Sequence, residues 1–465
     1  MVAQHSQARG PRDPDEMAEP LYASRYELQP IPKHRLPDDE MPAAVAARLV
    51  RDELALDGNP ALNLASFVTT WMEPEAVALM ADTADKNFAD VDEYPRTGEL
   101  EARCVNILAD LFNAPRSEAG GVGAATVGST EAIHLAGLAF KRRWQARQQA
   151  AGRPTTTPNF VIGHNDQVAW EKLARYFDIE VRFVPVTHER YVIDVEEALA
   201  RIDENTICVV GILGSTFTGE YEPIKELHDA LVEREQRTGQ HVPMHVDAAS
   251  GGFVAPFSDP DLLWDFRLPL VKSINVSGHK YGLVFPGVGW VLWREKEDLP
   301  EDLVFHINYL GADQPTLSLN FSRGSSQIIA QYYNLIRLGR TGYTRIIQGL
   351  MQTADYLAAA VEGTGHFQLV GQRNGLPLVC FRLSGEREYD EHDVARTVRG
   401  SGWIVPAYTM PPDAEDMTVL RVVVRENFSR DMADMLAEDL TRAVADLDAR
   451  PPGGHEHQAK TRGVC

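Results

Sequence analysis

The feature that most constrains the fold is an alternation of helical stretches with short β-branched runs between about residues 60 and 340. Strands separated by helices indicate an α/β domain around a largely parallel sheet, because parallel neighbours need a long crossover connection. In such sheets ligands bind beyond the carboxyl ends of the strands, so we expect the chemistry there. Six runs are expected as strands: 159–162, 181–186, 206–213, 242–246, 271–276 and 288–292.

The regions on either side of this alternation differ from it in composition and periodicity. Residues 1 to about 40 are polar and rich in proline, and apolar residues at helical spacing predict a helix over 43–56. A long helical region is expected from Gln327 past Gly339 to Ala360. Beyond it, strands and helices mix as in a small α+β domain. The strands are expected at 376–383, 403–405 and 419–424, and the helices near 390–398 and 430–447.

We therefore predict four parts. They are an N-terminal arm and helix (1–60), a large domain (61–345), a small C-terminal domain (346–450) and a flexible tail (451–465). One face of the last helix is expected to lie in the core, because its apolar residues form a stripe: Met432, Met435, Leu436, Leu440, Ala443, Val444 and Leu447.

Charge and cysteine usage exclude several classes of protein. The formal net charge of -22 argues against a nucleic acid or an anionic membrane surface as partner, so any anionic ligand must be captured locally. No apolar run is long enough to span a membrane, and the N-terminus lacks the apolar segment of a secretion signal, so a cytoplasmic protein is expected. The four cysteines are scattered, which favours reduced thiols over a zinc site or a disulfide framework.

Three segments carry the candidate chemistry, and the first surrounds Lys280. A β-branched strand runs into Ser277-Gly278-His279-Lys280. Most lysines after a strand lie on the surface, but this one follows a core strand and sits in a glycine-containing turn. Burial there would lower the pKa of its amine and make it a nucleophile for a Schiff base.

The second segment delivers Asp247 at the end of an apolar strand, followed by small residues that include Ala249. A carboxylate there needs a cationic partner, and a pyridinium nitrogen would serve. A turn aspartate or a helix cap is an equal alternative on this segment alone. A metal site at His245-Val246-Asp247 is disfavoured because further ligands cannot be located, so no metal is expected.

In the third segment Gly128-Ser129-Thr130 precedes an amphipathic helix, and a helix N-terminus with two hydroxyls suits a phosphate. Simple helix capping is the more common use of such residues. Together, however, an imine lysine, a carboxylate for a ring nitrogen and a phosphate site are what pyridoxal 5'-phosphate requires.

Long segments of the chain resemble the glutamate decarboxylases of the pyridoxal-phosphate-dependent group II decarboxylase family. The resemblance covers about residues 40 to 450, through NLASFVTTW, ADKNFADVDEYP, TVGSTEAIHLAG, AWEKLARYFD, STFTGEYEP, HVDAASGGFVAPF, SGHKYGL and NFSRGSSQIIAQYY. It implies an α/β protein of the aspartate-aminotransferase-like fold type I. Such a protein has a large domain with a mostly parallel mixed sheet and a small α+β C-terminal domain. It also forms a homo-oligomer, for which the alternatives are a dimer and a hexamer.

The resemblance also implies roles for individual residues. Lys280 would hold the cofactor, Asp247 would pair with the ring nitrogen, and Gln167 and Ala249 would lie on opposite faces of the ring. Thr216 would lie beside the cofactor, and Ser322 would reach the phosphate from the adjoining subunit. The phosphate neighbours would be Ser129, Thr130, Ser277 and His279, and the substrate contacts Ser66, Phe67, Asn87, Asp90 and Arg421.

The implied reaction is the α-decarboxylation of L-glutamate to 4-aminobutanoate (GABA) and carbon dioxide with uptake of one proton, with Lys280 or His279 as proton donor. Another pyridoxal-phosphate decarboxylase or lyase of the same fold, and a non-catalytic scaffold, remain as alternatives. The tail carries His455 and His457, for which a pH switch is weighed against simple disorder. It lacks a basic amphipathic pattern, so calmodulin is not expected as a partner.

Overall fold

The computed structural model describes residues 31–89, 92–307 and 314–450. The chain divides into two compact units, residues 1–62 and 63–465. The described part of the first unit contains α1 (Ala43–Leu54), which confirms the expected helix with an end two residues earlier, and a short 3₁₀ turn at Pro60–Leu62. The predicted division of the rest of the chain at residue 345 stays a prediction.

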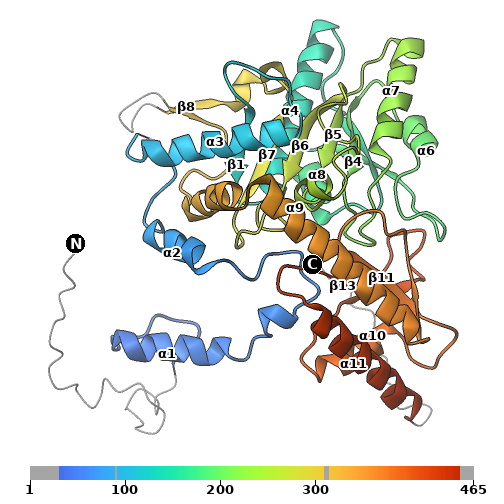
Figure 1. The fold of residues 1–465 in the computed structure, drawn as a ribbon. Helices are drawn as coiled ribbons and strands as arrows, with labels where there is room; N and C mark the ends of the chain where they lie inside the picture. The colour runs from blue at the N-terminus through green and yellow to red at the C-terminus, as the bar shows by residue number, and fades with distance from the viewer. Residues whose placement is uncertain (1–30, 90–91, 308–313, 451–465) are drawn as a thin grey trace. The chain divides into compact units, whose positions relative to one another are not determined.

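A seven-stranded sheet forms the centre of the second unit (Figure 1). Its strands lie in the order β1-β7-β6-β5-β4-β2-β3, and β7 alone runs antiparallel to its neighbours. The mostly parallel mixed sheet is therefore confirmed. The strands are β1 (Val122–Thr126), β2 (Asn159–Gly163), β3 (Glu180–Val184), β4 (Thr206–Ile212), β5 (Met244–Asp247), β6 (Val271–Val276) and β7 (Gly289–Trp293).

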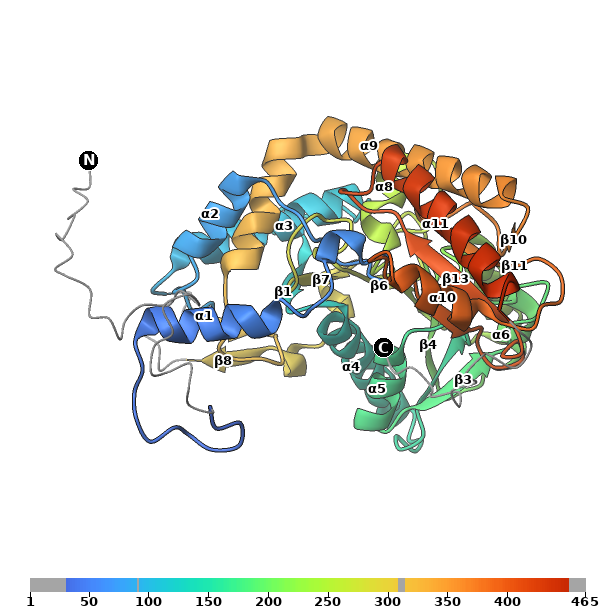
Figure 2. The same cartoon turned by 90° about the horizontal axis from the view of Figure 1, so that it is seen from below.

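Helices cover both faces of this sheet. In Figure 2, α4 and α5 lie on one side and α8 and α9 on the other. Every residue of β2 and β4 is buried, as expected for strands between two helical layers. The helices of this part are α2 (Pro74–Asp82), α3 (Pro95–Leu111), α4 (Ser129–Ala150), α5 (Val168–Tyr176), α6 (Val195–Ala200), α7 (Ile224–Thr238), α8 (Ala255–Ser258) and α9 (Ser326–Gly363), with 3₁₀ turns at Gly251–Phe253, Lys296–Asp298 and Glu301–Leu303.

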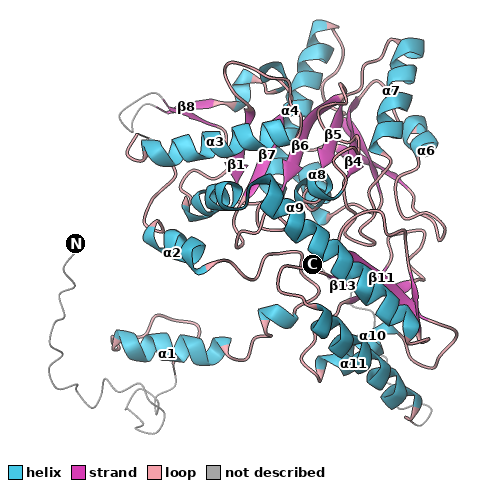
Figure 3. Cartoon of the chain, in the orientation of Figure 1, coloured by secondary structure: helices cyan, strands magenta, loops and turns pink. Residues whose placement is uncertain are grey.

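A second, antiparallel sheet lies toward the C-terminus, with strand order β10-β11-β13-β12 (Figure 3). It confirms the expected small α+β region. Its strands are β10 (Phe367–Leu369), β11 (Leu378–Leu383), β12 (Ala407–Thr409) and β13 (Thr418–Val423), and its helices are α10 (Glu391–Arg399) and α11 (Arg430–Asp448). A separate hairpin pairs β8 (Phe305–Ile307) with β9 (Gln314–Thr316). None of the described helices is both long and apolar enough to cross a membrane.

Three details differ from the sequence predictions. The strand expected at 403–405 is wrong: Ile404 makes only an isolated bridge to Asn63, and β12 begins after Pro406, which has no N–H to donate to a ladder. Met435 is 50% exposed rather than in the core, while Leu436 and most of the predicted stripe are buried. The strand β1 was not predicted, because its sequence VGAAT consists mainly of small residues of low β-propensity.

Candidate active site

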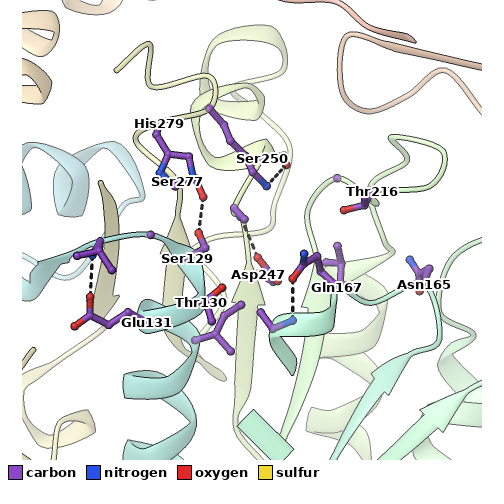
Figure 4. Close-up of a pocket in the computed structure, with 18 residues that line it drawn as sticks. Ser129, Thr130, Glu131, Asn165, Gln167, Thr216, Asp247, Ser250, Ser277 and His279 are labelled. Carbon is purple, nitrogen blue, oxygen red and sulfur yellow. Dashed lines mark hydrogen bonds between the residues drawn. The ribbon is translucent and has the colours of Figure 1, made fainter. Parts of the chain in front are cut away.

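A cavity of about 360 Å³ opens at the carboxyl ends of the parallel strands. The loops after β2, β4, β5 and β6 and the start of α4 all contribute to its wall, which is where the sequence predicted the chemistry. Figure 4 shows Ser129, Ser277 and His279 together on one side of Asp247 and Gln167 and Thr216 on the other. The wall includes nine of the predicted site residues: Ser129, Thr130, Gln167, Thr216, Asp247, Ala249, Ser277, His279 and Lys280.

The amine of Lys280 lies inside this cavity. Its Nζ donates a hydrogen bond to Ser250 Oγ at 3.0 Å and lies 5.3 Å from the ring centre of Phe67. Burial lowers the pKa of the amine to about 8, while nearby Asp247 opposes this shift and Arg421 adds to it. A substantial fraction of the amine is therefore neutral near physiological pH, as a nucleophile requires.

Asp247 ends β5 and is 6% exposed. Its Oδ2 accepts a hydrogen bond from Trp170 Nε1 at 2.8 Å. Its Oδ1 accepts from Asn275 Nδ2 at 2.9 Å and from the Ala249 backbone N–H at 3.0 Å. All three partners are donors, which suits a carboxylate facing a cationic group in the cavity.

The start of α4 forms the predicted anion site. Gly128 occupies the N-cap position, none of the described side chains caps the helix, and Ser129 Oγ lies 2.7 Å from Ser277 Oγ. The first-turn amides and the two hydroxyls thus gather at the positive end of a 22-residue helix. A Cβ at Gly128 would lie 3.1 Å from His279 Cε1, so glycine permits this close approach.

His279 and Gln167 complete the wall. Burial lowers the pKa of His279 to about 4, and the neighbouring Lys280 adds to this shift, so the imidazole is neutral near pH 7. Among the described residues its Nδ1 is buried and has no hydrogen-bond partner. Gln167 caps α5, with its side chain accepting from the Ala169 N–H at 2.8 Å.

Phe67 and Arg421 lie beside the cavity rather than in its wall. The Arg421 guanidinium lies 4.9 Å from the ring centre of Phe67 and 5.3 Å from that of Tyr408. It donates to the carbonyl oxygens of Ala65, at 2.7 Å, and Thr216. This buried cation therefore contacts a cavity residue, while the Ser66 hydroxyl accepts from the Val68 N–H at 3.1 Å.

The structure of the single chain does not bring the other predicted residues to the cavity. Asn87 Nδ2 donates to Ser322 Oγ at 3.4 Å, and Asn87 Oδ1 accepts from the Arg323 N–H at 3.2 Å, away from the residues of the wall. The expected role of Ser322 in an adjoining subunit stays a prediction. Asp90 lies outside the described residues, as do His455 and His457.

Sequence reasoning missed several residues of the wall, among them Glu131, Asn165, Gly214 and Ser250. Glu131 joins two segments, because its carboxylate accepts from the N–H groups of Val127 and Leu319, each at 2.8 Å. The signal for Asn165 and Gly214 was their position just after a predicted strand. Nothing in the sequence marked Ser250 apart from its proximity to Asp247.

A family model described as the pyridoxal-dependent decarboxylase conserved domain matches residues 37–384. The chain belongs to this family of pyridoxal-dependent decarboxylases. It is 57% identical to a glutamate decarboxylase of Petunia hybrida, over 92% of this chain and 86% of the relative, and 47% identical to one of Aliivibrio fischeri, over 95% of both.

A solved structure of the Lactobacillus brevis glutamate decarboxylase superposes with a TM-score of 0.90 at 45% identity, covering 93% of this chain and 99% of that one. An Oryza sativa TDC structure with PLP and tryptamine superposes with a TM-score of 0.76 at 18% identity, which shows the fold alone.

The cofactor of this family is pyridoxal 5'-phosphate, and the residues of the cavity fit it. The amine of Lys280 is partly neutral, the carboxylate of Asp247 faces the cavity, and the N-cap residue of α4 is a glycine, which has no side chain to cap the first amides of the helix. Lys280 would hold the aldehyde carbon, Asp247 the ring nitrogen, and Ser129 with Ser277 the phosphate.

Proposed function

We propose that this protein is a carboxy-lyase of glutamate metabolism that converts L-glutamate into 4-aminobutanoate and carbon dioxide. The observation that carries the proposal is the meeting of Lys280, Asp247 and the uncapped start of α4 in one cavity, in a chain 57% identical to a glutamate decarboxylase. When bound, the cofactor supplies a protonated ring that accepts the electron pair left as carbon dioxide departs.

Different residues of the chain would hold different parts of the cofactor. Asp247 would place its carboxylate beside the ring nitrogen, and its three hydrogen bonds fix its orientation. The start of α4 would hold the phosphate through its first-turn amides, a local anion site in a protein of net charge -22. Gln167 and Ala249 would enclose the ring from opposite faces, so that water has less access to the reacting carbon.

Lys280 is the better candidate for returning a proton to the α-carbon. Its pKa of about 8 means that Nζ can both hold and release a proton near neutral pH. The pKa of His279, about 4, leaves its imidazole without an extra proton to give. We assign His279 to the cofactor's surroundings and the proton to Lys280 Nζ.

Substrate binding is assigned first to Arg421, which lies beside the cavity. Arg421 is a cation beside Phe67 and Thr216, where it would hold a carboxylate of glutamate once its bond to one backbone oxygen is exchanged. Ser66 and Asp90 are proposed for the remote carboxylate, and Asn87 for a further substrate contact. Asp90 lies outside the described residues and would bind the carboxylate as a neutral carboxyl group. An Asp90→Ala variant with an unchanged KM for glutamate would contradict that role.

We further propose a homo-oligomer, at least a dimer, that works in the cytoplasm. The position of Ser322 supports the oligomer, because this residue is exposed and does not line the cavity of its own chain, so that it could reach a phosphate only in an adjoining subunit. The buried free thiols of Cys104, Cys208 and Cys380 suit a reducing compartment.

The test is a comparison of substrates. The full-length chain loaded with pyridoxal phosphate should release carbon dioxide from L-glutamate faster than from L-aspartate or an aromatic amino acid. Faster turnover of one of these would support the alternative decarboxylase. A chain that binds the cofactor but turns over none of them would support the scaffold.

A further inference from the structure

Four polar side chains form a line on the face of the sheet that α4 and α5 cover. They belong to His245, Asp247, Ser273 and Asn275. Strands β5 and β6 are parallel, and their register pairs His245 with Ser273 and Asp247 with Asn275. Since alternate residues of a strand share a face, the four side chains lie together on one surface. His245, Ser273 and Asn275 are 0% exposed.

The hydrogen bonds of this line have one direction. Asn275 Nδ2 donates to Asp247 Oδ1 at 2.9 Å, which turns the Asn275 amide oxygen toward His245 Nε2 at 2.7 Å. Because an amide oxygen only accepts, Nε2 must carry the hydrogen of the imidazole. Nδ1 is then the acceptor for the Ser273 hydroxyl at 2.7 Å. Every donation therefore leads toward Asp247.

A neutral imidazole is what this pattern requires. Burial lowers the pKa of His245 to about 4, so the ring carries a single N–H near neutral pH. A protonated ring would present a second donor to Ser273 and force its hydroxyl to turn away. With a single N–H on the ring, each of these hydrogen bonds has only one possible direction.

Trp170 on α5 contacts both Asp247 and His245 from the helical layer. Its Nε1 donates to Asp247 Oδ2 at 2.8 Å, and its ring meets that of His245 edge-on, with centres 5.2 Å apart. Phe140 on α4 lies 6.3 Å from the same imidazole, also edge-on. Buried polar groups are costly unless they are fully hydrogen-bonded, and an apolar core would be at least as stable. A contribution to stability therefore does not explain why these polar side chains are buried, and we look for a role in the site.

We propose that His245, acting through Asn275, is a positioning residue that holds the Asp247 carboxylate toward the ring nitrogen of the cofactor, and that Ser273 fixes the required tautomer of His245. This inference rests on the proposed pairing of Asp247 with that nitrogen. It goes beyond the pairing by assigning the orientation of the carboxylate to residues that touch neither cofactor nor substrate.

Two variants of His245 in the full-length chain test it. In His245→Gln the amide can still donate where Nε2 does, whereas His245→Leu has no donor. We expect the dissociation constant for pyridoxal phosphate, measured by fluorescence titration, to rise about tenfold in the leucine variant and to change by less than about twofold in the glutamine variant. His228→Leu replaces another buried histidine, on α7, and should leave the constant unchanged.

An equal loss of affinity in both His245 variants would show that ring packing alone matters and would overturn the proposal, as would no loss in either. Should the leucine variant fail to fold, Ser273→Ala serves instead. It removes only the distal donor and should weaken binding about threefold, with an unchanged melting temperature. Unchanged affinity there also overturns the proposal.

Asp247→Asn separates this inference from the proposed function. If that change leaves cofactor affinity and the visible absorbance of the loaded chain intact, the assignment of Asp247 itself is wrong. If Asp247→Asn weakens binding while the His245 and Ser273 variants do not, only the positioning role fails.

Discussion

The lowered pKa of Lys280 leads to a quantitative prediction about how the cofactor attaches. At pH 7 an amine of pKa about 8 is neutral in about one molecule of eleven, against about one in 3,000 for an ordinary lysine of pKa about 10.5. Burial thus raises the population of reactive amine about 300-fold. Arg421 lowers this pKa and Asp247 raises it, so removing each should move the titration in opposite directions.

The assay follows the growth of the visible band after pyridoxal phosphate is added to the full-length apoprotein at a series of pH values. The rate should titrate with a midpoint near pH 8 in the unmodified chain. The midpoint should rise in Arg421→Leu and fall in Asp247→Asn. Arg96→Leu removes an exposed cation that pairs with Glu99 and should not move it. A midpoint near that of free lysine, or shifts of the same sign in both variants, would refute the reasoning.

Three further predictions concern single substitutions. Lys280→Ala should abolish the visible absorbance of the loaded chain, and a retained band would mean that another amine holds the cofactor. Gly251→Ala would drive a Cβ into the Leu213 carbonyl oxygen and should cost about 3 kcal/mol in denaturant unfolding. Gly349→Ala, in open space within α9, should instead gain about 1 kcal/mol, and equal effects would contradict this account. Burial raises the pKa of Glu222 to about 7. Between about pH 4.5 and about pH 7 the folded chain therefore holds a proton that the unfolded chain releases. The contribution of Glu222 to the free energy of unfolding falls as the pH rises through that range. Glu222→Gln should therefore gain stability relative to the unmodified chain across that range, and a constant difference between the two would be inconsistent with it.

Much of the fold could be predicted from the sequence, because periodicity and burial coincide. The apolar run of β4 is buried on both faces of the sheet, so its sequence carries a strong strand signal. The strand β1 carries none, since its small residues fit between α3 and β7 only in the tertiary context. The misplaced strand before Pro406 shows how one missing N–H decides where a ladder begins.

The site was predictable where a residue follows a strand, as Asp247 and Lys280 do. It was not predictable where the residue acts through a neighbour on another element. His245 was considered only as a metal ligand, and its place beside Ser273 depends on the register of two strands 28 residues apart. Ser322 does not line the cavity of the single chain, and its predicted contact with the phosphate involves a second subunit. Asn87, predicted as a substrate contact, instead donates to Ser322.

The central claim is that this site removes the α-carboxylate of L-glutamate and returns one proton to the same carbon. The most direct measurement is to run the reaction in deuterium oxide and examine the product by mass spectrometry and NMR. The account predicts 4-aminobutanoate with one deuterium on the carbon that lost carbon dioxide, formed by the loaded chain and not by Lys280→Ala. Release of no carbon dioxide from glutamate, or a product without that single deuterium, would contradict it.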